Sequence, residues 1–200
     1  HCVTRRQRQM CIRDSFFTIR SILEKYLPEV VRFFILKAHY RSPLNYSDNQ
    51  LDDAKQGLTR LYLSIRNGAQ ASESEIDWSS DYSKRFKEAL DDDFNTPEAI
   101  AILFELANEI NKNQDDQKIQ LLKNLAKSLG ILTMNPEDFL KGEIASDGDK
   151  NELKIDKLID ERNLAKENKN FEEADRIRKL LLKNDILLED TPEGTIWRKK

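Results

Sequence analysis

The 200-residue sequence has little of what metal centres and disulfide frameworks require. Its only cysteines are Cys2 and Cys11, and its only histidines are His1 and His39. Because no paired ligand spacing joins these residues, they do not assemble a zinc site. The scarcity of cysteine favours a reducing, cytoplasmic setting. We therefore expect this chain to hold no metal and to need no cofactor of its own.

Long apolar runs and an excess of charge of one sign are also missing. Because no run of about eighteen apolar residues occurs, no membrane span is expected. Lys and Arg number 33 and Asp and Glu number 36, which gives a formal net charge of -3. This balance provides no overall basic field for holding nucleic acid non-specifically, so no DNA partner is expected. Any RNA contact must come from local clusters of side chains, or from another part of a larger protein.

Residues 1–15 differ from everything that follows them. They are rich in Arg and Gln, and they contain neither an apolar period nor the apolar core of a signal peptide. A basic RNA-binding arm and a tail of foreign origin are both compatible with this composition. The foreign tail is the preferred interpretation, since charge runs are usually only solvated. The fold prediction therefore begins at Phe16.

The segment 16–46 contains a strongly apolar helix. Pro28 and Glu29 are a good helix start, because proline lacks only a donor that the first turn does not use. The residues that follow are apolar nearly all round the helix, which is typical of a buried helix. The segment should therefore pack against something larger than itself, and this indicates a missing partner domain.

Residues 47–140 contain several amphipathic helices joined by short connections. Ser47 and Gln50 form a capping-box pattern, and Asn67–Gly68 is expected to end that helix. Thr96–Pro97–Glu98 begins another helix, and Gly130 closes a further one. Apolar residues keep helical spacing throughout. Short connections between such helices predict an antiparallel bundle.

The end of the chain is predicted to be a smaller unit, 153–200, after a polar linker at 141–152. Two helices come first, and short strands at 186–188 and 195–197 flank a turn that carries Pro192 and Gly194. The second helix should bury one apolar face, made of Phe171, Ala174, Ile177 and Leu181. The predicted fold class is mainly α: an antiparallel helical bundle followed by a small helix–helix–β-hairpin unit.

The sequence contains no complete active site. Asp91–Asp92–Asp93 looks like a metal-binding or acid/base cluster, but successive carboxylates at a helix end do not converge on one ion. Acidic residues before a helix are more simply caps and dipole partners. His39 follows an apolar helix, where a lone histidine is more often structural than a base.

A binding site near the C-terminus is more plausible. Its candidate residues combine stacking groups with hydrogen-bond donors and acceptors, as in the recognition of unpaired RNA bases: Phe171, Asp175, Arg178, Asp190 and Trp197. The alternative is that Phe171 and Trp197 form a small core, while Asp175 and Arg178 make a surface pair of little energetic worth. Chemistry alone favours this alternative.

Three long segments resemble one known family. They are PEVVRFFILKAHYRSPLNYS, ALDDDFNTPEAIAILFELANEIN and FEEADRIRKLLLKNDILLEDTPEGTIWR, which cover 28–47, 89–111 and 171–198. Together they resemble the C-terminal part of the cysteinyl-tRNA synthetases, in the right order and at the right spacing. Members of this family are class I aminoacyl-tRNA synthetases, which activate cysteine with ATP and transfer it to its tRNA.

The resemblance implies a domain organisation, partners and a site. Residues 16–46 correspond to the stem-contact region that leaves the catalytic domain, 47–140 to the bundle of the DALR type, and 153–200 to the anticodon-binding domain. The implied partners are the tRNA for cysteine and the missing N-terminal catalytic domain. The family's anticodon-contacting positions fall on Lys166, Phe171, Asp175, Arg178 and Asp190. Lys166 stands where arginine is common, and Phe171 stands where tryptophan is common.

The same comparison implies that the catalytic parts are missing. The KMSKS signature of the family ends just before the segment at Phe16, where this sequence has Gln9 to Ser15 without a lysine. The HIGH signature and the zinc ligands of the family would lie further upstream, and ATP with magnesium would bind there too. The chain is thus expected to be a tRNA-binding part that is inactive alone. The alternative is a freestanding helical-bundle adaptor without an RNA role.

Overall fold

The computed structural model describes residues 18–66, 68, 75–141, 148–191 and 194–199. The predicted tail at 1–15, the helix end at Asn67 and the turn residue Pro192 lie outside the described residues, as does half of the predicted linker, 142–147. The elements of the bundle and its approach are α2 (Ile19–Leu23), α3 (Pro28–Leu36), α4 (Asp48–Ile65), α5 (Asp81–Asp91), α6 (Thr96–Asn113), α7 (Asp116–Ser128) and α8 (Pro136–Lys141). Those of the C-terminal unit are α9 (Gly148–Glu167), α10 (Phe171–Lys183), β1 (Ile186–Thr191) and β2 (Gly194–Lys199).

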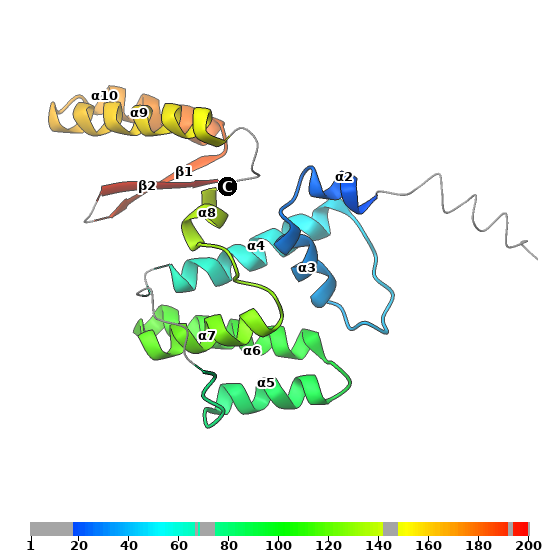
Figure 1. The fold of residues 1–200 in the computed structure, drawn as a ribbon. Helices are drawn as coiled ribbons and strands as arrows, with labels where there is room; N and C mark the ends of the chain where they lie inside the picture. Colours follow the sequence, from blue (N-terminus) through cyan, green and yellow to red (C-terminus); the bar gives the residue numbers. More distant parts are fainter. Residues whose placement is uncertain (1–17, 67, 69–74, 142–147, 192–193, 200) are drawn as a thin grey trace, which may run out of the picture.

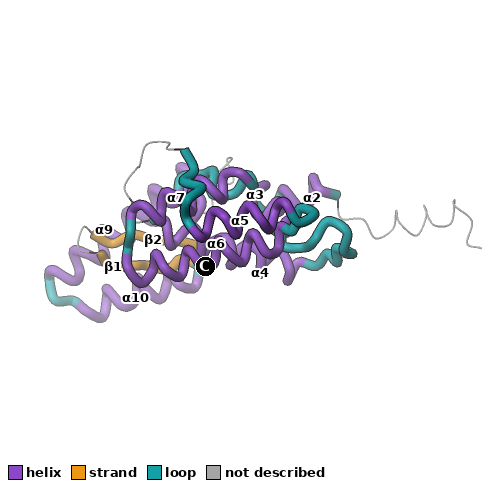
Figure 2. Tube along the Cα trace, turned by 90° about the horizontal axis from the view of Figure 1, so that it is seen from below, coloured by secondary structure: helices purple, strands orange, loops and turns teal. Residues whose placement is uncertain are grey.

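The mainly helical fold class is confirmed, and helix α4 is central to the bundle. It packs against α3, α6, α7 and α8, and α5 covers the other side of α6 (Figures 1 and 2). The capping prediction at Ser47 is confirmed, since its hydroxyl accepts the backbone N–H of Gln50. The apolar period of each helix supplies a continuous core, whose largest fully buried side chains include Leu51, Leu58, Tyr62, Phe86, Leu103, Leu106 and Leu122. None of the described helices combines the length and the apolar character needed to cross a membrane.

Helix α3 belongs to the same core as the bundle. Val30 is 2% exposed and Phe33 is fully buried, while Ile35 is 51% exposed. The expectation of burial all round is therefore only partly right, because the helix buries the face that meets α4 and leaves the opposite face open. Glu29, which is 4% exposed, accepts hydrogen bonds from the Tyr62 hydroxyl (2.6 Å) and the backbone N–H of Thr133 (3.0 Å). A buried carboxylate thus joins α3 to the bundle.

The C-terminal unit has its own small core under an antiparallel hairpin. Strands β1 and β2 pair from Ile186 opposite Lys199 to Thr191 opposite Gly194. The core side chains of this unit come from both helices and both strands: Ile159, Ile177, Leu181, Ile186 and Trp197. The Trp197 indole N–H donates to Asp156 on α9 at 3.2 Å. A hairpin alone is marginally stable in water, so its packing on α9 and α10 is what holds it.

Two details of this unit differ from the sequence expectation. Helix α9 begins at Gly148, five residues before the expected start of the unit at residue 153. Its first turns carry no apolar period, so the pattern could not reveal them. Phe171, expected on the buried face of α10, is 64% exposed because it is the first residue of that helix and lies outside the core contact made by Ala174 and Ile177.

An ionic clamp joins the C-terminal unit to the bundle. The clamp consists of Arg66 at the end of α4, Glu137 on α8, Glu189 on β1 and Arg198 on β2. Arg66, with a side chain only 8% exposed, donates to Glu137 through Nε (2.6 Å) and Nη2 (3.1 Å), and to Glu189 through Nη1 (2.6 Å). Arg198 donates to Glu189 at 2.7 Å. Close to the clamp, the Lys141 ammonium lies 5.6 Å from the centre of the Trp197 ring.

The clamp gives the contact between the two units a pH dependence. Burial raises the pKa of Glu189, but the hydrogen bond from Arg198 and the charge of Arg66 outweigh burial and leave this pKa below its usual value of 4.5. The unfolded carboxyl therefore binds a proton before the folded one as the pH falls. The clamp's contribution is fully present above about pH 4.5 and is lost as the pH drops through the lowered pKa.

Glu189→Gln is expected to loosen the C-terminal unit without unfolding either core. The amide cannot accept two charge-assisted bonds from Arg66 and Arg198, and each such bond contributes about 1.5–3 kcal/mol. Spin labels at the exposed positions of Lys87→Cys on α5 and Lys179→Cys on α10 report the distance between the units. The distance distribution should broaden in the variant at pH 7.

The control is Glu105→Gln, which breaks the two-bond pair with Arg85 inside the bundle. The labelled proteins carry Cys2→Ser and Cys11→Ser, so that only the introduced cysteines react. An unchanged distribution in Glu189→Gln, or equal broadening in the control, would show that the clamp does not set the orientation of the C-terminal unit.

Candidate RNA-contact site

Three of the predicted site residues line one side of α10. Phe171, Asp175 and Arg178 are spaced by four and three residues, so they lie above one another beside the buried face of the helix. All three are exposed, and the Phe171 ring is 64% exposed. Within the described part of the chain, neither the Asp175 nor the Arg178 side chain makes a hydrogen bond or an ion pair. These three residues, termed the α10 stripe, therefore present an aromatic face, an acceptor and a guanidinium to solvent.

The neighbouring charges on α10 behave differently. Arg176 donates to Glu173 through Nε (2.8 Å) and Nη2 (2.6 Å), so its guanidinium already has a partner. The expected alternative for Asp175 and Arg178, a surface pair, is not formed. Arg176 lies two residues from Arg178 and on the opposite side of the helix. The helix thus has one side with satisfied charges and another with unsatisfied charges.

The other two predicted residues, Lys166 and Asp190, contact each other. The Lys166 ammonium lies 2.9 Å from Oδ2 of Asp190. Arg162 on α9 meets the same carboxylate in a parallel fork, with both N–O distances at 3.0 Å. The Thr195 hydroxyl lies 2.8 Å from Oδ1 of Asp190. Asp190 therefore joins β1 to α9 and to its partner strand β2.

These contacts strongly stabilise the charged form of Asp190. Hydrogen bonds from Arg162, Lys166 and Thr195 hold the pKa of this carboxyl well below its usual range. Arg162 itself is 4% exposed, which makes it the buried member of the pair. Its role was missed in the sequence, although its position seven residues after Ile155 and three after Ile159 places it on the apolar face of α9. The available signal was a charged residue at a position where the apolar period of the helix predicts a core side chain.

The turn between α9 and α10 brings the two parts of the site toward one end of the unit. Lys166 lies in the last turn of α9 and Phe171 begins α10. Asn170 caps α10, since its side-chain oxygen accepts the backbone N–H of Glu173. Lys169 has a φ of 56°, a left-handed conformation that lets the chain reverse in so few residues. Leu164, 60% exposed, adds an apolar side chain near this end.

The chemistry of the site is that of recognition. An exposed aromatic ring can stack on an unpaired base, a guanidinium provides donors in a fixed fork, and a carboxylate accepts from base amino groups. In the described part of the chain, no group of three or more Asp, Glu, His or Cys side chains could hold a metal ion. Within the Asp91–Asp92–Asp93 run, Asp93 accepts from Tyr40 (2.7 Å) and Arg41 (3.1 Å), so it fastens the loop after α3 to the α5–α6 turn.

Two family models match parts of this chain. The DALR domain matches residues 85–134, from within α5 to the connection after α7. The class I (C) tRNA synthetase catalytic domain matches residues 6–56, which include α2, α3 and the start of α4. The second match begins inside residues 1–15, whose foreign origin stays a prediction. Neither match reaches α9, α10 or the hairpin.

Relatives in several organisms match nearly the whole chain. The cysteine–tRNA ligase of Aromatoleum aromaticum is 54% identical over 186 residues, that of Methylobacillus flagellatus 57% over 185, and that of Neisseria meningitidis serogroup B 52% over 185. Each alignment covers 92% of this chain and 39–40% of the relative. The chain therefore spans about 40% of the length of the relatives it matches.

The helical bundle and the segment before it are of the kind found in class I tRNA synthetases. Within that class, the chain is similar over 92% of its length to the cysteine–tRNA ligases, at 52–57% identity. The resemblance inferred from three segments of the sequence is thereby confirmed. The individual roles of Lys166, Phe171, Asp175, Arg178 and Asp190 stay predictions.

Proposed function

We propose that this chain is the tRNA-binding, C-terminal part of a cysteine–tRNA ligase. In this proposal the C-terminal unit contacts the anticodon of the tRNA for cysteine, and the bundle braces the tRNA. The α10 stripe is the observation that carries the proposal, since it leaves a stacking group, an acceptor and a donor fork unpaired on one exposed side. The similarity to these relatives supplies the ligand, because a relative named cysteine–tRNA ligase acts on tRNA.

Several further properties belong to the same proposal. The activation of cysteine with ATP is assigned to a catalytic domain that precedes these residues in the whole ligase, in the cytoplasm. Magnesium and zinc, where the ligase uses them, are assigned to that domain as well. The chain alone is not expected to charge tRNA. Lys166 and Asp190 pair with each other, so they would contact RNA only through the ammonium hydrogens and carboxylate lone pairs that this ion pair leaves unused.

Arg178→Ala is expected to reduce discrimination between the cognate tRNA and one with a changed anticodon. A lost pair of hydrogen bonds to a base edge costs about 1–3 kcal/mol of discrimination. The measurement is filter binding of both tRNAs to the whole chain. Arg176→Ala is the matched control, because it removes the same side chain from the other side of the same helix, where Glu173 already pairs with it.

The two outcomes that contradict the proposal are distinct. If Arg178→Ala weakens the binding of both tRNAs equally, Arg178 contacts the RNA backbone and does not read a base. If neither tRNA binds the parent chain, the adaptor alternative is favoured over an RNA-binding role.

A further inference from the structure

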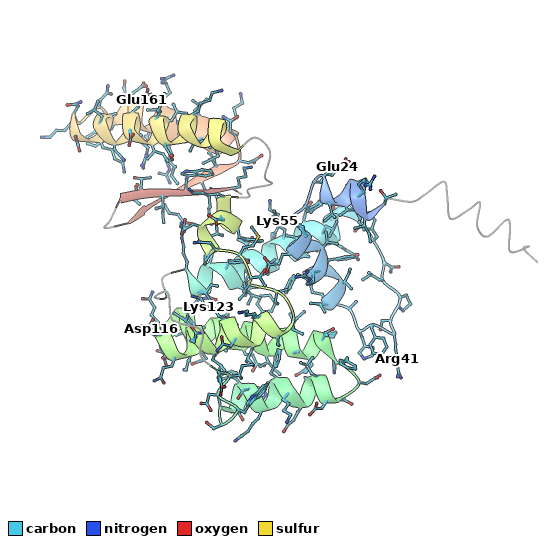
Figure 3. All side chains as sticks on the ribbon, in the orientation of Figure 1. Glu24, Arg41, Lys55, Asp116, Lys123 and Glu161 are labelled. Atoms are coloured by element: carbon cyan, nitrogen blue, oxygen red, sulfur yellow. The ribbon has the colours of Figure 1, made fainter. Side chains whose placement is uncertain are left out.

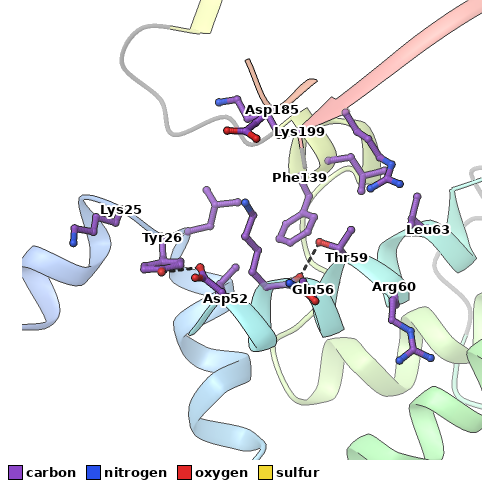
Figure 4. A pocket seen from close by; sticks show the side chains of 15 residues that line it. Lys25, Tyr26, Asp52, Gln56, Thr59, Arg60, Leu63, Phe139, Asp185 and Lys199 are labelled. Atoms are coloured by element: carbon purple, nitrogen blue, oxygen red, sulfur yellow. Dashed lines mark hydrogen bonds between the residues drawn. The ribbon is translucent and has the colours of Figure 1, made fainter. Parts of the chain in front are cut away.

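A cleft of about 970 Å³ lies between the bundle and the C-terminal unit. One wall comes from α4 and from the residues just before α3, and the other wall comes from β2 and the residue before β1 (Figure 4). Phe139 and Leu140 of α8 lie between the walls, and both are 4% exposed. Lys55 lies on the side of α4 that faces the C-terminal unit (Figure 3). The cleft is therefore formed by two units that are far apart in the sequence.

The lining of the cleft is basic in a chain whose net charge is -3. It includes two carboxylates, Asp52 and Asp185, against five cationic side chains: Lys25, Lys55, Arg60, Arg198 and Lys199. Asp52 accepts the hydroxyl hydrogen of Tyr26 at 2.8 Å. Burial, followed by this hydrogen bond, raises the pKa of Tyr26 to about 12, so the phenol stays neutral at physiological pH. The cleft is thus a local basic site on an acidic protein.

Cations on both walls are available to a ligand. In the described part of the chain, the Lys199 side chain has no hydrogen-bond or ion-pair partner. Lys25 has a side chain that is 64% exposed and makes only a loose ion pair with Asp48, at 3.9 Å. Arg198 is held in place through Glu189 by the clamp. The wall formed by β2 therefore carries a fixed cation, Arg198, next to an unpaired one, Lys199. The opposite wall carries a third cation, Lys25.

The position of the cleft indicates an elongated anionic ligand. At one side stands the unit that carries the α10 stripe, and at the other stand Lys25 and Leu27, within the residues that match the catalytic-domain model. An RNA that contacts both units spans the gap in which the cleft lies. Phosphate oxygens attract lysine and arginine without regard to base identity, and Gln56 and Thr59 add polar groups between the cations.

We propose that this cleft binds the sugar-phosphate backbone of RNA. The inference rests on the proposed tRNA-binding function and adds a second, sequence-independent contact to it. The clamp sets the width of the cleft, because Arg66 holds Glu189 and thereby the hairpin that forms the wall with Arg198 and Lys199. Backbone contacts in the cleft position the RNA, while the α10 stripe reads the bases.

The test is the salt dependence of tRNA binding by the double variant Lys25→Gln/Lys199→Gln. Each lost phosphate contact reduces the slope of log K against log salt by about 0.7–0.9, so two lost contacts reduce it by about 1.4–1.8. The loss of affinity should be equal for the cognate tRNA and for one with a changed anticodon. The control is Lys84→Gln/Lys87→Gln, which removes the same charge from exposed positions on α5, away from the cleft.

Each outcome separates this inference from the proposed function. An unchanged salt slope in the cleft variant overturns the proposal that the cleft binds RNA. The anticodon role still stands in that case if Arg178→Ala loses discrimination between the two tRNAs. If the α5 control changes the salt slope as much as the cleft variant does, overall charge is the cause, and the proposal that the cleft binds RNA is again overturned. A reduced slope with equal affinity loss supports the cleft even if Arg178→Ala shows no base reading. No binding of RNA by the parent chain overturns both proposals.

Discussion

Asp190→Ala is expected to unfold the C-terminal unit, because it leaves the Arg162 guanidinium buried without its counter-charge. The Arg162 side chain is 5% exposed, and two of its guanidinium nitrogens each lie 3.0 Å from a carboxylate oxygen of Asp190. Removing one partner of a fully buried ion pair costs about 3–5 kcal/mol, and the cost here lies toward the lower end because the Asp190 side chain is 52% exposed. A unit of about fifty residues is near the lower size limit for independent folding. A loss of this size therefore removes most of its stability.

The unfolding of this unit can be followed separately from that of the bundle. Trp197 is 6% exposed in the hairpin core, whereas the only other tryptophan, Trp78, is 49% exposed. In a Trp78→Phe background, the fluorescence of Trp197 reports the C-terminal unit during urea unfolding. The transition should move to much lower urea in Asp190→Ala, while the circular dichroism of the bundle helices persists.

Two further variants test the cause of this loss. Lys166→Gln removes the partly exposed partner of Asp190 and should cost less than about 1 kcal/mol, as exposed ion pairs do. Arg162→Leu combined with Asp190→Val removes both charges and should recover much of the stability lost in Asp190→Ala. Equal losses for Lys166→Gln and Asp190→Ala, or no recovery in the double variant, would contradict the buried-charge explanation.

This expectation changes how the candidate site is interpreted. A substitution at Asp190 that abolishes tRNA binding would not identify a base contact, since the unit itself would unfold. The pKa of Asp190 is lowered by Arg162 first and Lys166 second, so its stabilising charge is present above its usual pKa of 3.8 and is lost only at more acidic pH. Base reading is therefore best tested on the α10 stripe, whose side chains do not hold the fold.

Local sequence patterns predicted most of the fold. Capping residues and the apolar period determine where helices such as α4 and α6 begin and which faces they bury, and both signals are contained within a few residues. The hairpin also followed from short apolar runs around a turn. Phe171, Asp175 and Arg178 were predicted as site candidates from their chemistry and from the resemblance, whereas the apolar period placed Phe171 on the buried face.

Non-local ion pairs could not be predicted in this way. Arg66 and Glu189 are 123 residues apart, and nothing in either neighbourhood indicates that they meet. The same holds for the cleft, whose cations come from α4, from β2 and from the residues before α3, and gather where the two units meet. The exposure of Phe171 also depended on where α10 begins. These features result from the relative position of units, which a period within one helix does not encode.

Glu29→Ala is expected to destabilise the bundle by about 3–5 kcal/mol. It leaves the Tyr62 hydroxyl and the backbone N–H of Thr133 buried without an acceptor, at about 1–3 kcal/mol each, and it adds a cavity. Tyr62→Phe should cost less, about 1–3 kcal/mol, because Glu29 keeps its bond to Thr133. Urea unfolding followed by circular dichroism measures both changes.

The hydroxyl of Tyr62 also predicts the response of the bundle to alkaline pH. Burial, followed by its hydrogen bond to Glu29, raises the pKa of Tyr62 well above its usual value of 10. The unfolded chain therefore ionises first, and stability is complete below about pH 10 and falls as the pH rises above it. Tyr62→Phe should remove this part of the alkaline loss. Tyr46→Phe is the matched control, since its hydroxyl donates to Asp48 at the surface. If Tyr62→Phe alters neither the urea midpoint nor the alkaline slope more than this control does, the buried carboxylate does not fasten α3 to the bundle.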